Sequence, residues 1–238
     1  MTSAAMKRSA TAPANRRGVL IVGIVIILVV VVALIAIALS GNRSSDVDVA
    51  SIPQSRAEDG GFVLGNPNAP ITIIEFADFG CPHCQEYHPD VTRFLQDYVA
   101  TGKAKFEYRM FPTAGGQTTY YVGQLLECAE EQKAGSFWQG YNLMFSYAFS
   151  GLYFDNVGRR FATDAGLNYT ELLSCVDNGA TQVQTDINFG QQSGVTGTPA
   201  VMVRYNDGPA QFVTFDSRTY SSGGPPYSVL AQLAEAVQ

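Results

Sequence analysis

The chain has 238 residues, of which 46% are hydrophobic and 15% are charged, and its formal net charge is −6. The apolar and aromatic content excludes a disordered chain, and the length allows one ordinary domain with a short additional segment. Residues 41–238 contain 11 basic and 21 acidic side chains. Such an acidic part argues against nucleic-acid binding, which requires basic groups on the protein.

The first predicted element is an apolar segment of 22 residues, from 18 to 39. As a helix it would extend about 33 Å, enough to cross the hydrocarbon core of a bilayer, which is about 30 Å thick. Four basic residues and no acidic residue precede it, so the positive-inside rule predicts that residues 1–17 are cytoplasmic and that the rest of the chain is extracytoplasmic. A cleaved signal peptide is the alternative, although its apolar region usually has only about 7–15 residues.

The next segment, residues 40–60, is polar, contains several serines and lacks apolar periodicity. This composition is typical of flexible linkers. We therefore predict a tether between a single transmembrane helix in the cell membrane and one domain at 61–238.

The domain is predicted to begin with a strand–helix–strand unit. An apolar, β-branched strand is expected at 71–79, and the apolar residues from Tyr87 to Tyr98 fall on one face of a helix. Residues 105–111 alternate between apolar and polar and predict a second strand. The pattern is that of a βαβ unit, for which a right-handed crossover is expected.

The remaining elements predict an α/β fold with an inserted helical part. Helical patterns separated by glycines occupy residues 115–192. Strands are expected at 200–205 and 211–215, and an amphipathic helix at 226–237 closes the chain.

The most informative motif is Cys81-Pro82-His83-Cys84, which stands where the first helix is expected to begin. Two cysteines at this spacing can close a small disulfide ring, and the positive end of the helix dipole favours a thiolate at Cys81. The His83 imidazole would stabilise that thiolate further, and Pro82 suits the first helical turn. Because a stabilised reduced form makes the disulfide a stronger oxidant, the motif favours a disulfide donor.

The motif has two alternative roles. A zinc site would need a second cysteine or histidine pair, but Cys128 and Cys175 stand alone and far apart. A structural disulfide usually closes a longer loop than this motif allows. We therefore predict neither a metal nor another cofactor.

Two further features support redox chemistry. Glu75 lies in an otherwise apolar strand, so burial would raise its pKa and suit it to accept a proton from Cys84. An exposed position at the strand end is the alternative for Glu75. The second feature is Thr198-Pro199, which precedes an apolar strand. His88, on the predicted active-site helix, is expected at the surface.

These motifs together resemble the DsbA-like branch of the thioredoxin superfamily. The stretch GNPNAPITIIEFADFGCPHC, the helical insert and the later GVTGTPA are similar to those of membrane-anchored bacterial disulfide oxidoreductases. The resemblance implies a thioredoxin fold with an all-helical insertion. It also implies that Cys81 is the exposed reacting sulfur and that Cys84 is the buried resolving partner.

The resemblance implies more about the substrate site. Thr198 and Pro199 would form a cis-proline pair that binds an extended substrate segment, and Glu75 matches the buried acidic position of the superfamily. One departure concerns the direction of the reaction, because thiol oxidases of the best-known kind carry valine before the cis-proline, whereas Thr198 is typical of isomerases.

The second cysteine pair, Cys128 and Cys175, lies in the helical insert. Outside the cytoplasm, an even number of cysteines favours a bridge between them. Its 48-residue loop would stabilise the fold by about 3–4 kcal/mol in the chain-entropy model. A regulatory or electron-relay role and two free thiols are the alternatives.

The sequence therefore predicts a monomeric, membrane-tethered, extracytoplasmic thiol–disulfide oxidoreductase. Its substrates would be reduced exported proteins, and the resemblance implies a quinone-linked membrane reoxidant of the DsbB or vitamin-K-epoxide-reductase (VKOR) type. An isomerase or a reductase of the same fold is one alternative. A holdase or adaptor that binds unfolded chains without turnover is another.

Overall fold

The computed structural model describes residues 47–237. The predicted transmembrane segment 18–39 and the predicted cytoplasmic residues 1–17 lie outside this range. Among residues 47–237, no helix is both long enough and apolar enough to span a bilayer.

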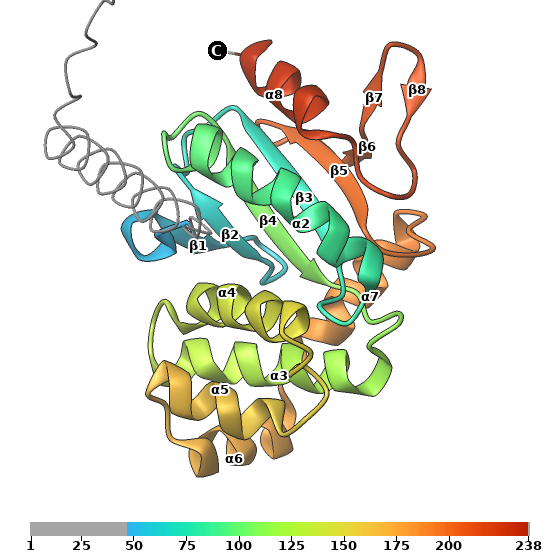
Figure 1. The fold of residues 1–238 in the computed structure, drawn as a ribbon. Coiled ribbons are helices and arrows are strands. Elements are labelled where there is room, and N and C mark those ends of the chain that lie inside the picture. The colour runs from blue at the N-terminus through green and yellow to red at the C-terminus, as the bar shows by residue number, and fades with distance from the viewer. Residues whose placement is uncertain (1–46, 238) are drawn as a thin grey trace, which may run out of the picture. The chain divides into compact units, whose positions relative to one another are not determined.

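A six-stranded sheet forms the centre of the described structure, and its strands lie in the order β1-β2-β4-β3-β5-β6 (Figure 1). The strands are β1 (Gln54–Arg56), β2 (Phe62–Gly65), β3 (Ile71–Ala77), β4 (Lys105–Met110), β5 (Ala200–Tyr205) and β6 (Gln211–Phe212). Strands β3 and β4 are parallel neighbours, and all other pairs in the sheet are antiparallel. The predicted βαβ unit is therefore present at the centre of the sheet.

The crossover helix of this unit is α2 (Pro82–Phe94), and it continues into a π-helical turn, η2 (Leu95–Val99). Strand β3 is buried along its whole length, which explains its continuous apolar sequence. The C-terminal helix α8 (Tyr227–Glu235) lies beside α2, because the Tyr227 amide donates to Asp90 on α2 at 3.1 Å. Both helices cover the same face of the sheet.

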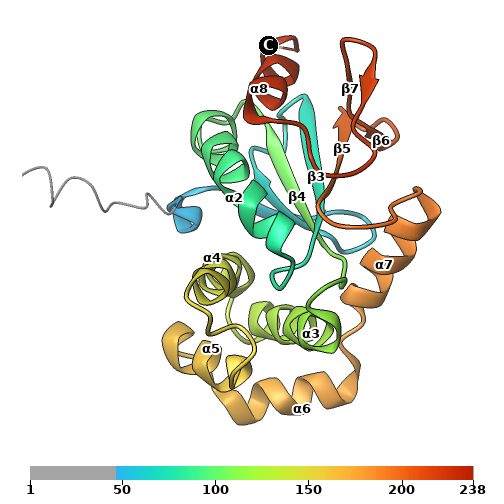
Figure 2. The same ribbon diagram turned by 45° about the vertical axis from the view of Figure 1, so that its right-hand side comes forward.

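The predicted helical insertion is confirmed as a separate layer at one end of the sheet (Figures 1 and 2). Its helices are α3 (Gly116–Gln132), α4 (Ser136–Phe149), α5 (Val157–Ala165) and α6 (Tyr169–Gly179). The following helix, α7 (Gln182–Gln192), leaves this layer and returns to the sheet. There, Ile187 and Phe189 pack in the small core on the face opposite α2.

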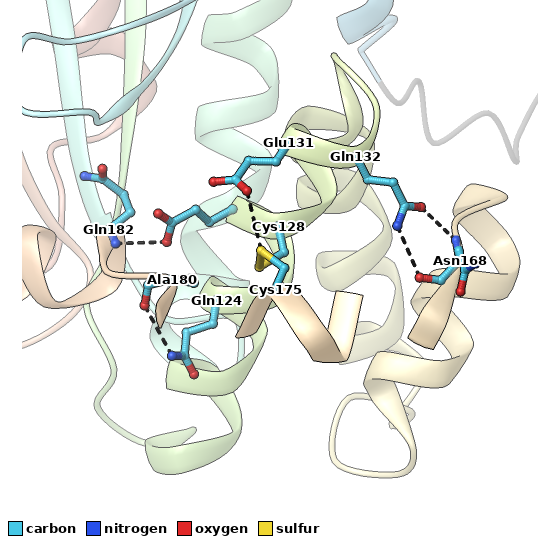
Figure 3. Close-up of a disulfide and its surroundings, with 9 residues drawn as sticks. Gln124, Cys128, Glu131, Gln132, Asn168, Cys175, Ala180 and Gln182 are labelled. Carbon is cyan, nitrogen blue, oxygen red and sulfur yellow. Dashed lines mark hydrogen bonds between the residues drawn. A yellow bond between two sulfur atoms is a disulfide. The ribbon is translucent and has the colours of Figure 1, made fainter. Parts of the chain in front are cut away.

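A disulfide between Cys128 and Cys175 ties α3 to α6, as Figure 3 shows. The Cα atoms of the two residues are 5.8 Å apart. Close to the bridge, Gln132 at the end of α3 exchanges hydrogen bonds with the backbone of Asn168, the N-cap of α6. The predicted bridge is therefore present, and it lies within the helical layer.

An ionic cluster is buried between the sheet and α7. The guanidinium of Arg109, on β4, is 1% exposed and donates to Glu107 at 2.7 Å and to Asp186 at 3.0 Å. Burial by itself would lower the pKa of Arg109, but the surrounding carboxylates, Glu107 first, raise it. Burial raises the pKa of Asp186 to about 6 despite the neighbouring guanidinium. The cluster thus fixes α7 against the sheet through polar groups on both elements.

The prediction of a flexible linker over residues 40–60 is wrong for residues 47–60. A short 3-10 helix, η1 (Val49–Ser51), and the edge strand β1 lie within it. Val47, Val49 and Ile52 are buried in the main core. These three residues anchor the segment because neighbouring elements bury them, although the segment itself has no apolar periodicity. The described domain therefore begins before residue 61, and strands β1 and β2 were not predicted.

The predicted strand at 211–215 is divided between two sheets. Residues 211–212 form β6, whereas β7 (Thr214–Phe215) pairs with β8 (Arg218–Thr219) in a separate hairpin. The hairpin turns at Asp216 and Ser217, both of which have positive φ angles. The division falls at Val213, which belongs to neither strand.

Candidate active site

The CPHC motif lies at the end of the sheet nearest the helical layer, where β3 gives way to α2. Cys81 is the N-cap of α2, in an extended conformation, and Pro82 occupies the first helical turn. Gly80 is required in the loop before it, because a Cβ atom there would lie 2.7 Å from the Cα of Gly115. The predicted placement of the motif at a helix N-terminus is therefore confirmed.

The two cysteines of the motif have different environments. Both are free thiols, but Cys81 is 5% exposed and Cys84 is fully buried. The Cys81 thiol lies 3.5 Å from the carbonyl oxygen of Thr198, and the Asp78 amide donates to the sulfur of Cys84, also at 3.5 Å. Both thiols are thus buried, Cys81 slightly less than Cys84, and the order of reaction that the resemblance implies stays a prediction.

Glu75 is buried in β3, with 1% of its surface exposed. Within residues 47–237, neither of its carboxylate oxygens has a hydrogen-bond partner. Burial raises the pKa of Glu75 to about 8. The alternative of an exposed strand end is therefore wrong for this residue.

The same buried region holds Cys84. Burial is the main cause that raises the pKa of the Cys84 thiol, and the Glu75 carboxylate raises it further. Because burial raises the pKa of Glu75 to about 8, this carboxyl can hold a proton at neutral pH and is suited to exchange it with Cys84. Its transfer to or from Cys84 stays a prediction.

Thr198 lies beside the CPHC motif because strand β5, which follows it, pairs with strand β3, which precedes the motif. Strand β5 begins at Ala200, which is opposite Phe76 near the end of β3. Because the two strands are antiparallel, the residues that precede β5 lie next to those that follow β3. The peptide bond between Thr198 and Pro199 is cis, as the resemblance implied.

The two histidines have different environments. His83 is 78% exposed, and its Nδ1 lies 3.3 Å from a carboxylate oxygen of Glu86, so stabilisation of a Cys81 thiolate by this imidazole stays a prediction. His88 is half-buried and not at the surface, because its ring stacks on Phe145 of α4 at 3.8 Å between centroids. Burial lowers the pKa of His88 to about 4.

Sequence reasoning missed Asp78, which follows β3 directly and is fully buried. Its carboxylate accepts hydrogen bonds from the amides of Gly80, Thr113 and Gly115 at 2.7–2.8 Å. The hydroxyls of Thr113 and Thr119 also donate to it. Asp78 therefore joins the active-site loop to the beginning of the helical layer. An aspartate within an apolar stretch is the signal that could have revealed it.

The site offers no evident place for a metal ion. Across residues 47–237, no group of three or more histidine, cysteine, aspartate or glutamate side chains is arranged to bind one. The chemistry that these residues support is thiol–disulfide exchange, because a partly accessible sulfur and a buried sulfur lie two residues apart at a helix N-terminus.

Comparison with known proteins agrees with this chemistry. A model of a family described as thioredoxin matches residues 57–208. This match covers more than half of the sequence, and the chain therefore belongs to that thioredoxin family.

The chain is also similar to several characterised proteins. It is 26% identical over 154 residues to disulfide bond formation protein D of Bacillus subtilis, covering 59% of this chain and 66% of the relative. It is 29% identical over 150 residues to the Na⁺/H⁺ antiporter NhaA 3 of Salinispora tropica, covering 62% of this chain. The match spans only 22% of that antiporter, so the likeness is to a part of it.

Solved structures share the fold. Wolbachia pipientis alpha-DsbA1 has a TM-score of 0.61 and 20% identity, covering 76% of this chain and 92% of that one. Oxidised BdbD from Bacillus subtilis has a TM-score of 0.55 and 22% identity, covering 73% of this chain and 90% of that one. The chain spans between about a fifth and two thirds of the length of the curated relatives it matches, and these solved structures show a shared fold.

Proposed function

We propose that this protein is a membrane-tethered, extracytoplasmic thiol–disulfide oxidoreductase that donates its Cys81–Cys84 disulfide to exported proteins. The observation that carries the proposal is the geometry of the site. Cys81 caps α2 and lies 3.5 Å from the Thr198 carbonyl before the cis-proline, while Cys84 is fully buried beneath it. One sulfur is thereby presented to a substrate, and the other is protected from it.

The reaction begins from the disulfide form. A substrate thiolate attacks the sulfur of Cys81, the bond between Cys81 and Cys84 breaks, and Cys84 leaves with the electron pair. A second substrate thiolate then attacks the substrate sulfur of the mixed disulfide, and Cys81 leaves as a thiolate. The helix N-terminus stabilises this leaving group. The substrate pair is oxidised, and the protein is left as the dithiol.

Glu75 supplies the proton that the first step needs. The leaving sulfur of Cys84 emerges in a buried environment that disfavours its anion. Because the pKa of Glu75 is raised to about 8, this carboxyl is largely protonated at neutral pH and can donate to that sulfur. In the reverse direction, its carboxylate would accept the proton from the Cys84 thiol.

The membrane tether of the proposal rests on the apolar run at 18–39 and on the basic residues before it. Reoxidation removes two electrons and two protons from the dithiol, and a quinone-linked membrane protein of the DsbB or VKOR type is the proposed acceptor. Tethering would keep the domain near such a partner and raise its effective concentration.

An isomerase or a reductase of the same fold is the second candidate, favoured by the threonine at 198. The equilibrium of the Cys81–Cys84 pair with glutathione separates these roles. An oxidase should hold a disulfide that glutathione reduces readily, whereas a reductase should hold one that resists it.

The trapping experiment tests the chemistry itself. In Cys84→Ala, a substrate disulfide attacked by Cys81 cannot be released by an internal thiol, so mixed disulfides should accumulate. They are measured on non-reducing gels and by mass spectrometry after incubation with an oxidised cysteine peptide. Cys81→Ala is the matched control and should trap nothing. Binding of unfolded chains with no trapped species would instead favour a holdase or adaptor.

The tether is tested on the full chain expressed in bacteria. We expect the protein to stay in the membrane fraction at alkaline pH and to be degraded by protease added outside spheroplasts. Release into the soluble fraction would contradict the anchor, and a protein shortened by about 38–40 residues would indicate a cleaved signal peptide.

A further inference from the structure

The loop before the cis-proline is held to the active site by few hydrogen bonds. For Thr196, Gly197 and Thr198, two hydrogen bonds connect the loop to other parts of the described chain, and the Thr198 side chain also interacts with the Cys84 thiol. The Cys81 thiol meets the Thr198 carbonyl, and the Thr198 hydroxyl lies 2.6 Å from the hydroxyl of Thr113. No heavy atom lies within 4 Å of a Cβ placed on Gly197, so close packing does not hold that position.

Of these three contacts, only the one between Thr113 and Thr198 involves no sulfur. The bond from Cys81 needs its S–H hydrogen, which is lost when Cys81 joins Cys84 or a substrate sulfur. The contact between Thr113 and Thr198 involves no sulfur. It therefore does not depend on the S–H hydrogen of Cys81.

Thr113 is itself fixed by Asp78. The amide of Thr113 donates to a carboxylate oxygen of Asp78 at 2.7 Å, and its hydroxyl lies 3.2 Å from the same oxygen. Asp78 is fully buried, and Gly80 also donates to it at 2.8 Å. The position of Thr113 is thus tied to the loop that carries Cys81.

The Asp78 carboxylate determines which hydroxyl group donates in the contact between Thr113 and Thr198. A carboxylate can only accept, so the Thr113 hydroxyl donates to Asp78. Because the Thr113 hydroxyl has only one hydrogen, its oxygen must accept the hydrogen bond from the Thr198 hydroxyl. The Thr198 hydroxyl thus donates to Thr113, and Thr113 donates to the buried carboxylate of Asp78. A hydrogen bond to a charged acceptor is stronger than one between neutral groups, and it polarises the hydrogen bond that precedes it.

We propose that Asp78 and Thr113 act as positioning residues that hold the Thr198 loop in its substrate-binding position while Cys81 is engaged in a disulfide. This inference rests on the proposed function, because it assigns substrate binding to the loop. Thr113 touches neither reacting sulfur, so it should affect how tightly an extended peptide binds, and it should leave the intrinsic reactivity of Cys81 unchanged.

The test compares Thr113→Val with the wild-type protein in the oxidised form. The rate of oxidation of a reduced two-cysteine peptide is measured against peptide concentration, and the rate with glutathione is measured in parallel. We expect the peptide KM to rise about three- to tenfold, as for the loss of one hydrogen bond, with kcat changed by less. The glutathione rate should stay within about twofold, because glutathione is too short to lie along the loop.

Two further variants separate positioning from a general loss of structure. Thr119→Val removes another hydroxyl that donates to Asp78 but has no contact with Thr198, so it should lower Tm and leave the peptide KM unchanged. Thr113→Ser keeps the hydroxyl and should behave as the wild type. Thr113 is exposed, and near-ultraviolet circular dichroism will check that each variant is folded.

A double-mutant cycle gives the final criterion. If Thr113 acts through Thr198, then Thr198→Val should raise the peptide KM as much as Thr113→Val, and the double variant should be no worse than either. An unchanged KM in Thr113→Val, or an equal rise in Thr119→Val, would overturn the inference. If the wild-type protein oxidises neither the peptide nor glutathione, the proposed function itself fails.

Discussion

Two buried carboxylates three residues apart have opposite environments. Asp78 accepts hydrogen bonds from three backbone amides and two hydroxyls. Glu75 has no hydrogen-bond partner among residues 47–237, and burial raises its pKa to about 8. The first carboxylate therefore organises the loops of the site, and the second is suited to exchange a proton. The residue type is nearly the same, and the surroundings decide the role.

The raised pKa of Glu75 predicts a particular dependence of stability on pH. The unfolded chain loses this proton near 4.5 and the folded protein near 8, so between these values the folded state binds more protons. The contribution of Glu75 to stability should therefore fall as the pH rises through this window, at up to about 1.4 kcal/mol per pH unit. Glu75→Gln removes the titration and should flatten this part of the curve, as measured by urea unfolding from pH 5 to 8.

An independent measurement tests the catalytic part of this prediction. In Glu75→Gln, proton transfer to or from Cys84 loses its partner, so peptide oxidation should slow by about 10²–10⁴-fold if Glu75 acts as a general acid or base. The same pH slope in variant and wild type, together with an unchanged rate, would show that Glu75 performs neither task.

Among the elements, β4 and α7 show how a polar contact can fix a helix. Arg109 alternates with the apolar residues of β4, and its guanidinium meets Asp186 of α7 and Asp59 of the loop before β2. Gln182 at the start of α7 also donates to Asp186, at 2.9 Å. The alternating sequence predicted the strand, but the partners lie 50 and 77 residues away and could not be read from the local pattern.

Removal of Arg109 should be costly because it leaves buried charges unpaired. Glu107 and Asp186 are 0% and 2% exposed, so Arg109→Met is expected to lower the free energy of unfolding by about 3–5 kcal/mol. The matched control is Arg93→Met, which removes a surface pair with Asp97 at 3.5 Å and should cost about 1 kcal/mol or less. Urea titrations followed by circular dichroism will compare the two. Equal costs would mean that Arg109 is not needed to neutralise the cluster.

At the scale of the whole molecule, the helical layer is stabilised by a second cysteine pair that is separate from the redox site. The bridge between Cys128 and Cys175 joins α3 to α6 across 47 residues of sequence. Cys81 and Cys84 lie on α2, at the end of the sheet. The two pairs are therefore expected to act independently, one on stability and one on catalysis.

The double variant Cys128→Ser/Cys175→Ser tests whether the two cysteine pairs act independently. Loss of the bridge should lower the free energy of unfolding by about 3–4 kcal/mol in the chain-entropy model. The fluorescence of Trp138, the single tryptophan of the chain and a buried residue of α4, reports the unfolding in urea. Peptide oxidation below the unfolding transition should stay within about twofold of the wild type. A lost or strongly altered oxidation rate would instead favour a relay or regulatory role for the bridge.

By itself, the sequence determined those features that depend on neighbouring residues. The spacing of CPHC at a helix start, the apolar runs of β3 and β5 and the periodicity of α2 were all predicted from local patterns. These features follow from short-range geometry, since a helix repeats every 3.6 residues and a strand every two.

Only the tertiary structure decided which distant groups meet. Three features join residues that are far apart in the chain. They are the burial of Val47, Val49 and Ile52, the packing of α7 on the sheet, and the connection of Asp78 through Thr113 to Thr198. Such contacts depend on the packing of complete elements, and a polar residue shows no local sign of the partner that will satisfy it. The sulfur chemistry could therefore be predicted from four consecutive residues, whereas the contacts that connect Asp78 to the Thr198 loop could be identified only in the folded structure.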